Sequence, residues 1–277
     1  MNNIVQAMQL PVEKLRPFEG HPFQVKDDAE MDQLVFSILT QGLLTPISVR
    51  PIENGEYEVI SGHRRLHACK KAGIETVPAL IYSLDRDAAT IAMVDSNLHR
   101  EKILPSEKAF AYKMKFDAMY HQGRTSGQVG QKWTRDQISE GESGRQVQRY
   151  IRLTELIPEI LIMVDNSKIA LTPAVEISYL TKQEQRDLLE TMESEDCTPS
   201  LSQAMQLKKL SQSGLLTMDS IFNLLREPKA NQQDKISFRV DDLRRYFPKS
   251  YSAARIQETI LKLLSDYQKK HNRDISR

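Results

Sequence analysis

The first part of the chain alternates between helical and extended spacing of its apolar positions. Between Asp28 and Gly42, apolar residues recur every three or four positions, which predicts a helix that an aspartate caps and a glycine ends. Short alternating segments then flank Asn54-Gly55, a strong signal for a β-hairpin. The predicted order is helix, strand, strand, short helix and strand, at residues 28–42, 47–50, 57–60, 62–73 and 77–82. This order indicates a small α+β domain.

From Asp85 onward the spacing is almost entirely helical. We expect one helix to reach Leu98, another to span 105–119, and a joint rich in glycine, serine and glutamine at 123–130. The helices expected over 131–210 are short, and prolines interrupt them at Pro158, Pro173 and Pro199.

The last fifty residues begin with a polar stretch near 226–235, which we interpret as a linker. A short alternating strand is expected next, with Ile236, Phe238 and Val240 on one face. An amphipathic helix over 251–271 follows, and its apolar stripe consists of Ile256, Ile260, Leu263, Leu264 and Tyr267. We therefore predict an α+β N-terminal domain (1–104), an all-helical domain (105–226) and a small C-terminal α/β unit (235–277).

Composition and charge narrow the function classes. The chain has 277 residues and a formal net charge of +1, which by itself predicts no nucleic-acid, membrane or acidic partner. Positive charge is concentrated after residue 200, so a polyanion site must be local. Two distant cysteines give neither a disulfide framework nor a zinc site. With no leader and no run long enough to span a bilayer, we expect a cytoplasmic protein.

A first candidate site lies where the strand ending near Ser61 turns into a helix through Gly62. Free backbone N–H groups and the positive end of the helix dipole favour a phosphate there, and the next residues, His63, Arg64 and Arg65, add two guanidiniums. A tight turn with two solvated arginines is the plainer interpretation, and the residues alone favour it, because short turns that contain glycine are common.

A second candidate cluster spans 95–101 on a predicted helix. Asp95, Asn97 and Glu101 offer the oxygen ligands that magnesium takes, and Arg100 can reach a phosphate. A charged, solvent-exposed helix end explains the cluster equally well. No spacing rule requires a metal at this position.

The third constellation predicts a helix-turn-helix over about 134–153. Thr134 is expected to cap a first helix, Gly141 to supply the turn, and Ser143 to cap the second helix. On the second helix, apolar residues share one face, and polar residues of the kind that bind phosphates and base edges share the opposite face. The candidate DNA-binding residues are Ser143, Arg145, Gln146, Gln148, Arg149 and Arg152. An ordinary amphipathic surface helix is the alternative.

Together these segments resemble the ParB/Spo-type DNA partition proteins, a family of CTP-dependent DNA clamps. Three blocks carry the resemblance in the family's order: Leu34–Pro51, Gly62–Gly73 as a Gly-Glu-Arg-Arg-like box, and Asn97–Glu107 as a Glu-Asn-x-x-Arg-Glu-like box. The helix-turn-helix follows where the family places it. The resemblance covers roughly residues 4–190.

The resemblance implies a ParB/sulfiredoxin-like N-terminal domain that binds CTP with magnesium, a helical domain that binds a specific, palindromic site in double-stranded DNA, and a C-terminal unit for partners or dimerisation. It implies plasmid, mobile-element or chromosome segregation as the role, with the protein on the nucleoid or a plasmid. By matched position the nucleotide-binding residues are Gln24, Gly62, His63, Arg64, Arg65, Asn97 and Arg100, with Asn97 also placed near Mg²⁺.

Two departures from the family pattern lower the CTP binding and the CTP hydrolysis that we expect. His63 replaces the usual glutamate of the second box, and Ser96 stands where an acidic residue commonly precedes the asparagine. We therefore expect weak nucleotide binding and at most a slow CTPase. Members of the family commonly use a basic N-terminal arm to stimulate a ParA-type ATPase. This sequence shows no such arm, so the resemblance alone does not establish that partner. The alternative function is a nucleotide-dependent small-molecule enzyme on the same fold, of the free amino acid kinase type.

Overall fold

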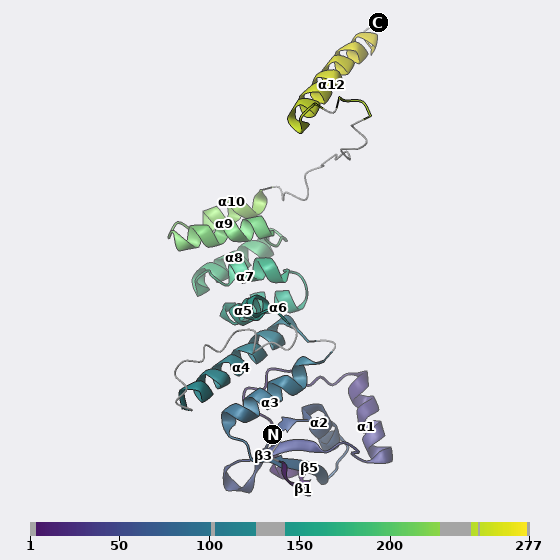
Figure 1. Ribbon diagram of the computed structural model, residues 1–277, viewed down its shortest axis with the longest axis vertical. Helices are drawn as coiled ribbons and strands as arrows, with labels where there is room; N and C mark the ends of the chain where they lie inside the picture. The colour runs from purple at the N-terminus through teal and green to yellow at the C-terminus, as the bar shows by residue number, and fades with distance from the viewer. Residues whose placement is uncertain (1–3, 101–102, 126–141, 228–244, 249, 276–277) are drawn as a thin grey trace. The chain divides into compact units, whose positions relative to one another are not determined.

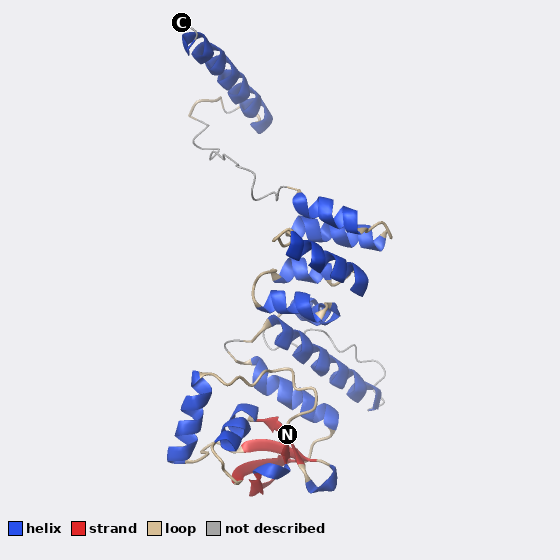
Figure 2. Ribbon diagram, turned by 180° about the vertical axis from the view of Figure 1, so that it is seen from behind, coloured by secondary structure: helices blue, strands red, loops and turns tan. Residues whose placement is uncertain are grey.

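The computed structural model describes residues 4–100, 103–125, 142–227, 245–248 and 250–275 (Figures 1 and 2). The chain forms two units, residues 1–227 and residues 228–277. All strands of the described residues lie in the N-terminal part of the first unit, and the other described residues of that unit are mainly helical, as Figure 2 shows. The predicted α+β class is therefore confirmed for this unit.

A mixed five-stranded sheet organises the N-terminal part, with strand order β1-β5-β3-β4-β2. β1 pairs antiparallel with β5, β3 pairs parallel with β5 and antiparallel with β4, and β2 pairs parallel with β4. The strands are β1 (Ile4–Pro11), β2 (Leu15–Arg16), β3 (Ile47–Pro51), β4 (Tyr57–Ser61) and β5 (Thr76–Tyr82). The strands predicted at 47–50, 57–60 and 77–82 are confirmed as β3, β4 and β5, and β1 and β2 are additions to them.

Three helices pack against this sheet: α1 (Ala29–Gln41), α2 (His63–Lys71) and α3 (Arg86–Leu98). The Asp28 side chain accepts a hydrogen bond from the Met31 backbone N–H at 2.9 Å, and Gly42 ends α1 with φ of 73°. Both predicted signals for α1 are confirmed.

The hairpin predicted at Asn54-Gly55 is also present. β3 and β4 are antiparallel, and the connection contains a 3₁₀ turn (Glu53–Gly55) in which Asn54 adopts φ of 62°. Asparagine and glycine tolerate this left-handed backbone, which explains the strength of the sequence signal.

The two faces of the sheet carry different apolar clusters. Neighbouring residues of β4 show the division, since Val59 packs with residues of α1 and α2 whereas Ile60 packs with residues of α3 and α4. Successive side chains of a strand point to opposite faces, so the sheet is covered on both sides. Cys69 is fully buried in the first cluster, and burial raises the pKa of its thiol, as expected of a core residue.

Helices of different lengths make up the rest of the first unit where the structure describes it. They are α4 (Pro105–Thr125), α5 (Gly144–Arg152), α6 (Pro158–Asp165), α7 (Leu171–Ile177), α8 (Lys182–Ser194), α9 (Leu201–Gln212) and α10 (Met218–Arg226), with a 3₁₀ turn at Leu153–Glu155. A single apolar cluster joins most of them, with Leu153, Ile160, Leu188 and Leu207 fully buried. A separate cluster around Tyr112, Met119 and Val147 joins α4 to α5.

One predicted boundary is wrong. The joint expected to begin at Gly123 lies in part inside α4, which runs to Thr125. A single glycine costs a helix only about 1 kcal/mol relative to alanine, and packing of α4 against α3 and α5 outweighs that cost.

The second unit contains α12 (Ala253–Ile275). Along this helix Ile256 is buried, whereas Leu263, Leu264 and Tyr267 are exposed. The strand predicted around Phe238 lies outside the described residues. Among the helices that the structure describes, none is long and apolar enough to cross a membrane.

Candidate functional site

The turn from β4 into α2 is built on Gly62. This residue has φ of 105° and precedes the first turn of α2. A Cβ placed on it would lie 3.1 Å from a guanidinium nitrogen of Arg65. Because both the backbone angle and the close approach disfavour a side chain, glycine is the residue that allows the helix to start directly after the strand.

A cavity of about 850 Å³ opens beside this turn. Of the predicted nucleotide-binding residues, it brings together Gln24, Arg64 and Arg100, which come from three separate blocks of the sequence. Its lining residues are Gln24, Lys26, Asp28, Glu30, Arg64, Arg100, Ile103, Leu104 and Glu107. We call this cavity the arginine pocket.

Charges of both signs line the arginine pocket. The Arg64 guanidinium lies 3.6 Å from an Asp28 carboxylate oxygen and 3.4 Å from a Glu30 carboxylate oxygen. Arg100 lies over the ring of Phe23, 5.4 Å from its centroid, and burial lowers the pKa of this guanidinium. Arginine side chains at the start of a helix are suited to phosphate oxygens.

The other four predicted nucleotide-binding residues do not line the pocket. Gly62 shapes the turn, and Arg65 Nη1 donates to the backbone carbonyls of Thr45 (2.6 Å) and Pro46 (2.8 Å). Asn97 is buried, and its amide nitrogen donates to the Met93 carbonyl at 2.8 Å. Arg65 therefore joins α2 to the segment before β3, whereas the Asn97 hydrogen bond stays within α3.

His63, the fourth of these residues, is buried at the first position of α2. Its Nε2 accepts a hydrogen bond from the Phe18 backbone N–H at 3.3 Å, and its ring lies 3.7 Å from that of His21, centroid to centroid. Burial, followed by the fields of His21 and Arg100, lowers the pKa of His63 to about 3. His63 is thus a neutral hydrogen-bond acceptor, unlike the glutamate that the family pattern places there.

Asp95, one of the two acidic residues considered as magnesium ligands, does not line the arginine pocket. Asp95 lies 2.5 Å from the buried ammonium of Lys115 and lines a different cavity, of about 520 Å³, together with Ser96. Glu101 lies outside the described residues. Within the described part of the chain, no group of three His, Cys, Asp or Glu residues is arranged to hold a metal ion.

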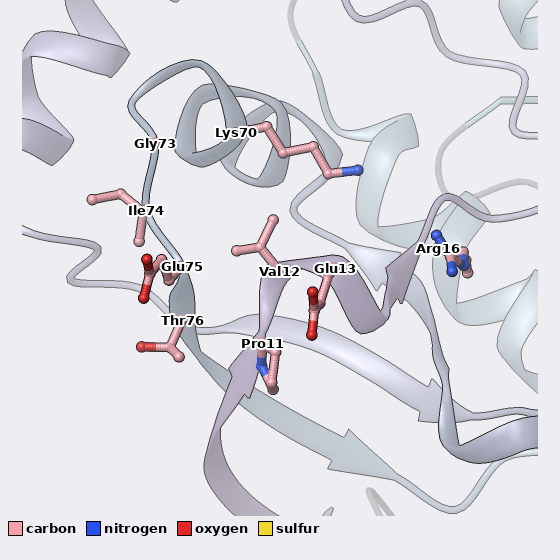
Figure 3. A pocket seen from close by; sticks show the side chains of 9 residues that line it. All are labelled: Pro11, Val12, Glu13, Arg16, Lys70, Gly73, Ile74, Glu75 and Thr76. Carbon is pink, nitrogen blue, oxygen red and sulfur yellow. The ribbon is translucent and has the colours of Figure 1, made fainter.

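A further cavity, of about 660 Å³, lies at the far end of α2 (Figure 3). Lys70 and Gly73 of the α2 end and Val12 and Glu13 after β1 contribute to its wall. None of the predicted site residues lines it. It therefore offers control positions away from the arginine pocket.

The predicted recognition helix is present as α5. Ser143 caps it, since its Oγ accepts a hydrogen bond from the Gln146 backbone N–H at 3.3 Å. Val147 is fully buried against α4, and the ring of Tyr150 lies 5.9 Å from that of Tyr112. Apolar packing thus orients the helix as predicted, whereas the first helix of the motif, from Thr134, and the turn at Gly141 lie outside the described residues.

The polar face of α5 is not uniformly free. Arg145 is exposed and Gln148 is half-buried. Arg149 donates to Gln146 Oε1 at 3.1 Å and to the Thr172 hydroxyl at 2.5 Å. Arg152 donates to the Ser178 carbonyl at 2.8 Å and lies 4.2 Å from the centroid of the Tyr179 ring. Arg152 is therefore engaged within the protein.

Glu107 is the main feature of the pocket that the sequence did not indicate as a site residue. Its carboxylate accepts hydrogen bonds from the backbone N–H groups of Gln24 at 2.8 Å and Leu104 at 3.0 Å. The Leu-Pro-Ser-Glu pattern marks it as part of a helix start, but only the fold brings it next to Gln24.

Residues 1–98 match the family model described as ParB N-terminal domain. These residues form a ParB N-terminal domain. The predicted resemblance is confirmed for this part of the chain.

Curated relatives match over the same part. Nucleoid occlusion proteins of Bacillus cereus (strain B4264) and Geobacillus sp. (strain WCH70) are 40% identical over 109 residues and 37% identical over 108 residues. Each match covers 39% of this chain, but only 37% and 38% of the relatives. The chain thus matches less than half of the length of these relatives.

Solved structures with detectable similarity include two of C-terminally truncated chromosome-partitioning protein ParB from Caulobacter crescentus. The complex with the centromeric parS site is 22% identical, with a TM-score of 0.45, and covers 80% of this chain and all of that chain. The complex with CTP-gamma-S is 26% identical, with a TM-score of 0.33, and covers 62% and 92%. Sulfiredoxin from Arabidopsis thaliana is 30% identical, with a TM-score of 0.26, and covers 28% and 86%.

Proposed function

We propose that this chain is a site-specific DNA-binding protein of the partition or nucleoid occlusion type, and that its ParB N-terminal domain binds CTP with Mg²⁺. The observation that carries the proposal is the arginine pocket, in which Gln24, Arg64 and Arg100 from three separate blocks lie together beside a helix start. Guanidiniums and a helix N-terminus are the groups that bind phosphates.

In this proposal Arg64 and Arg100 bind the phosphates, and Gln24 contributes another part of the pocket wall. Gly62 forms the turn from β4 into α2, and His63 and Arg65 hold the neighbouring loops through Phe18 and Pro46. The Asn97 amide bonds within α3. Magnesium would bind through nucleotide oxygens, because Asn97, the residue that the resemblance places near the metal, is buried and does not line the pocket. Because a carboxylate is missing at Ser96, we propose weak binding and slow or absent hydrolysis.

Isothermal titration with CTP, ATP and GTP in the presence of Mg²⁺ tests this proposal. We expect CTP to bind in preference to the other two, and Arg64→Gln to weaken CTP binding by about tenfold through loss of charge-assisted hydrogen bonds. Lys70→Gln is the matched control, because Lys70 lines the separate cavity in Figure 3. The absence of heat with all three nucleotides at millimolar concentration would reject the nucleotide site.

The DNA-binding part of the proposal rests on α5. Its capped N-terminus and exposed Arg145 are presented by a helix that Val147 anchors, and we propose that Ser143, Gln146, Gln148 and Arg149 complete the contact surface. We assign Arg152 a positioning role, since its guanidinium holds the start of the loop after α7. We further propose that the protein is a homodimer and that its DNA site is palindromic, because a two-fold symmetric dimer presents the same helix to each half of the site.

Chromatin immunoprecipitation with sequencing would identify the DNA site, and fluorescence anisotropy at several salt concentrations would then test α5. Replacing Arg145 and Arg149 together by alanine should weaken specific binding by about 1–3 kcal/mol if they contact bases. It should reduce the salt dependence of binding if they contact phosphates. Arg186→Ala is the control, because this exposed arginine lies on α8. If affinity and salt dependence stay unchanged in the double variant, α5 is not the recognition helix.

The alternative function is a nucleotide-dependent small-molecule kinase. Such an enzyme requires a substrate site beside the nucleotide, but has no need of a capped, arginine-bearing helix such as α5. A ParA-type ATPase remains a proposed partner, and its ATP turnover measured with and without this protein would test it. We propose a nucleoid- or plasmid-associated location in the cytoplasm, where DNA partition takes place.

A further inference from the structure

The first turn of α4 connects the arginine pocket with the helical part of the first unit. The Ser106 backbone N–H and hydroxyl donate to the Asp165 carboxylate at the end of α6, at 2.9 and 2.6 Å. The Lys108 ammonium donates to Glu142, just before α5, at 2.8 Å. Between these residues, Glu107 faces the pocket.

The environment of the Glu107 carboxylate has the character of an anion site. Its two hydrogen bonds come from backbone N–H groups, one in the Gln24 loop and one at Leu104, immediately before α4. The residue is 8% exposed, and its negative charge acts on the neighbouring Arg100. Backbone N–H groups, a helix N-terminus and a guanidinium are the donors that proteins use to bind phosphate.

The other two acids of the pocket are held differently. Asp28 caps α1 through the Met31 N–H, and the side chain of Glu30 is 79% exposed. Both lie at the rim near Arg64. Glu107 is thus the acid that occupies buried donors, and a bound polyphosphate would compete with it directly.

We propose that Glu107 is an internal substitute for a phosphate group, and that a triphosphate binds in the arginine pocket by displacing its carboxylate from the Gln24 N–H and from the neighbourhood of Arg100. This inference rests on the proposed nucleotide function of the pocket. Displacement also frees the Leu104 N–H, which Glu107 caps. The occupied pocket would therefore loosen the first turn of α4, the segment that contacts Asp165 and Glu142.

Glu107→Gln tests the displacement, because glutamine keeps the size of the side chain and one acceptor but removes the negative charge. Isothermal titration is performed with CTP and with inorganic tripolyphosphate, first with EDTA and then with Mg²⁺. We expect both ligands to bind about fivefold more tightly to the variant in EDTA, since a competing buried charge is gone. Glu30→Gln, an exposed acid of the same pocket, is the matched control and should change affinity by less than about twofold.

A second measurement uses the wild-type protein and so does not depend on the stability of the variant. Hydrogen exchange with mass spectrometry should show faster exchange in the peptide that contains Leu104 when tripolyphosphate is added, because its amide loses the Glu107 acceptor. Protection of this peptide instead would overturn the inference.

The outcomes separate this inference from the nucleotide proposal. Unchanged affinity of Glu107→Gln shows that Glu107 only caps α4, and weaker binding confined to Mg²⁺ shows that it is a metal ligand; either result overturns the inference, even if CTP binds well. Tighter binding of tripolyphosphate without any preference for CTP supports the displacement and rejects the nucleotide function. No binding of either ligand to either protein overturns both.

Discussion

His21 and His63 form a close pair of imidazole rings in the N-terminal domain. Their rings lie 3.7 Å apart between centroids at an angle of 35°, and burial lowers the pKa of both imidazoles. His63 accepts a hydrogen bond from the Phe18 N–H, so the neutral form is the one that the fold requires. Protonation of His63 would remove this acceptor and place a positive charge beside Arg100.

The first prediction concerns stability at low pH. The pKa of His63 falls from 6.5 to about 3 on folding, so the unfolded chain takes up a proton between these values and the folded protein does not. The free energy of unfolding should therefore be greatest above pH 6.5 and fall by about 2 kcal/mol between pH 7 and pH 5 from this group. Urea unfolding at a series of pH values measures the fall.

His63→Gln should remove this part of the pH dependence, because an amide oxygen also accepts a hydrogen bond but does not titrate in this range. His67→Gln is the control, since His67 is partly exposed beside Asp27. If the wild type and His63→Gln lose stability in parallel from pH 7 to pH 5, His63 is not buried in its neutral form.

At the scale of whole elements, α3 and α4 are joined by an ion pair that includes a buried charge. The Lys115 ammonium on α4 is 4% exposed, whereas the Asp95 carboxylate on α3 is 32% exposed and lies 2.5 Å away. Removing one partner of such a pair leaves the other charge without compensation, and the cost is larger for the partner that is more deeply buried.

The second prediction is an asymmetry between the two partners. Asp95→Asn should lower the free energy of unfolding by about 2 kcal/mol or more, because the buried ammonium of Lys115 loses its counter-ion. Lys115→Met should cost less, since the Asp95 carboxylate is hydrated in part, and the double variant should be more stable than Asp95→Asn alone. Chemical denaturation of the three variants measures the coupling.

Glu195→Gln provides the comparison for an exposed pair. Glu195 accepts a hydrogen bond from Arg226 at 2.9 Å, but the arginine side chain is 61% exposed. Its loss should cost less than about 1 kcal/mol. Equal effects of Asp95→Asn and Glu195→Gln would mean that the contact of α3 with α4 does not depend on the buried charge.

Local signals predicted the elements that depend on local chemistry. The Asp28 cap, the glycine after α1 and the Asn54-Gly55 connection act within a few residues, and each is present in the structure. β1 was missed because its pairing partner, β5, lies about seventy residues away in the sequence, and pairing across such a separation leaves no local signal.

The candidate site shows the same division. Arg64 and Arg100 were identified from residue type and position, and both line the arginine pocket. The sequence did not show that Arg65 binds the carbonyls of Thr45 and Pro46, or that Glu107 meets Gln24, because these contacts join segments about 20 and 83 positions apart. Such contacts depend on tertiary packing.

At the scale of the whole molecule, the proposed functions lie in different segments. The arginine pocket belongs to the N-terminal part and α5 to the helical part of the first unit, and α12 belongs to the second unit. Arg64→Gln should therefore leave binding to a short DNA duplex nearly unchanged. Anisotropy with the duplex identified by sequencing measures this, and loss of DNA binding in this variant would contradict the separation.

The last prediction is that the protein is a homodimer through α12. Four residues of this helix share one stripe: Ile260, Leu263, Leu264 and Tyr267. The last three are 58–65% exposed, although side chains of this size are usually covered. A second copy of the same helix would cover the stripe in an isologous contact, and a homodimer carries two copies of α5, one for each half of a palindrome.

Analytical ultracentrifugation at micromolar concentration tests this arrangement. Leu263→Asp, which places a charge in the centre of the stripe, should convert the dimer to a monomer and weaken binding to a full palindrome more than binding to a half-site. Leu261→Asp is the matched control, because Leu261 is equally exposed but lies about 120° around the helix from the centre of the stripe. A wild-type monomer with and without DNA, or equal effects of the two variants, would show that this stripe is not the dimer contact.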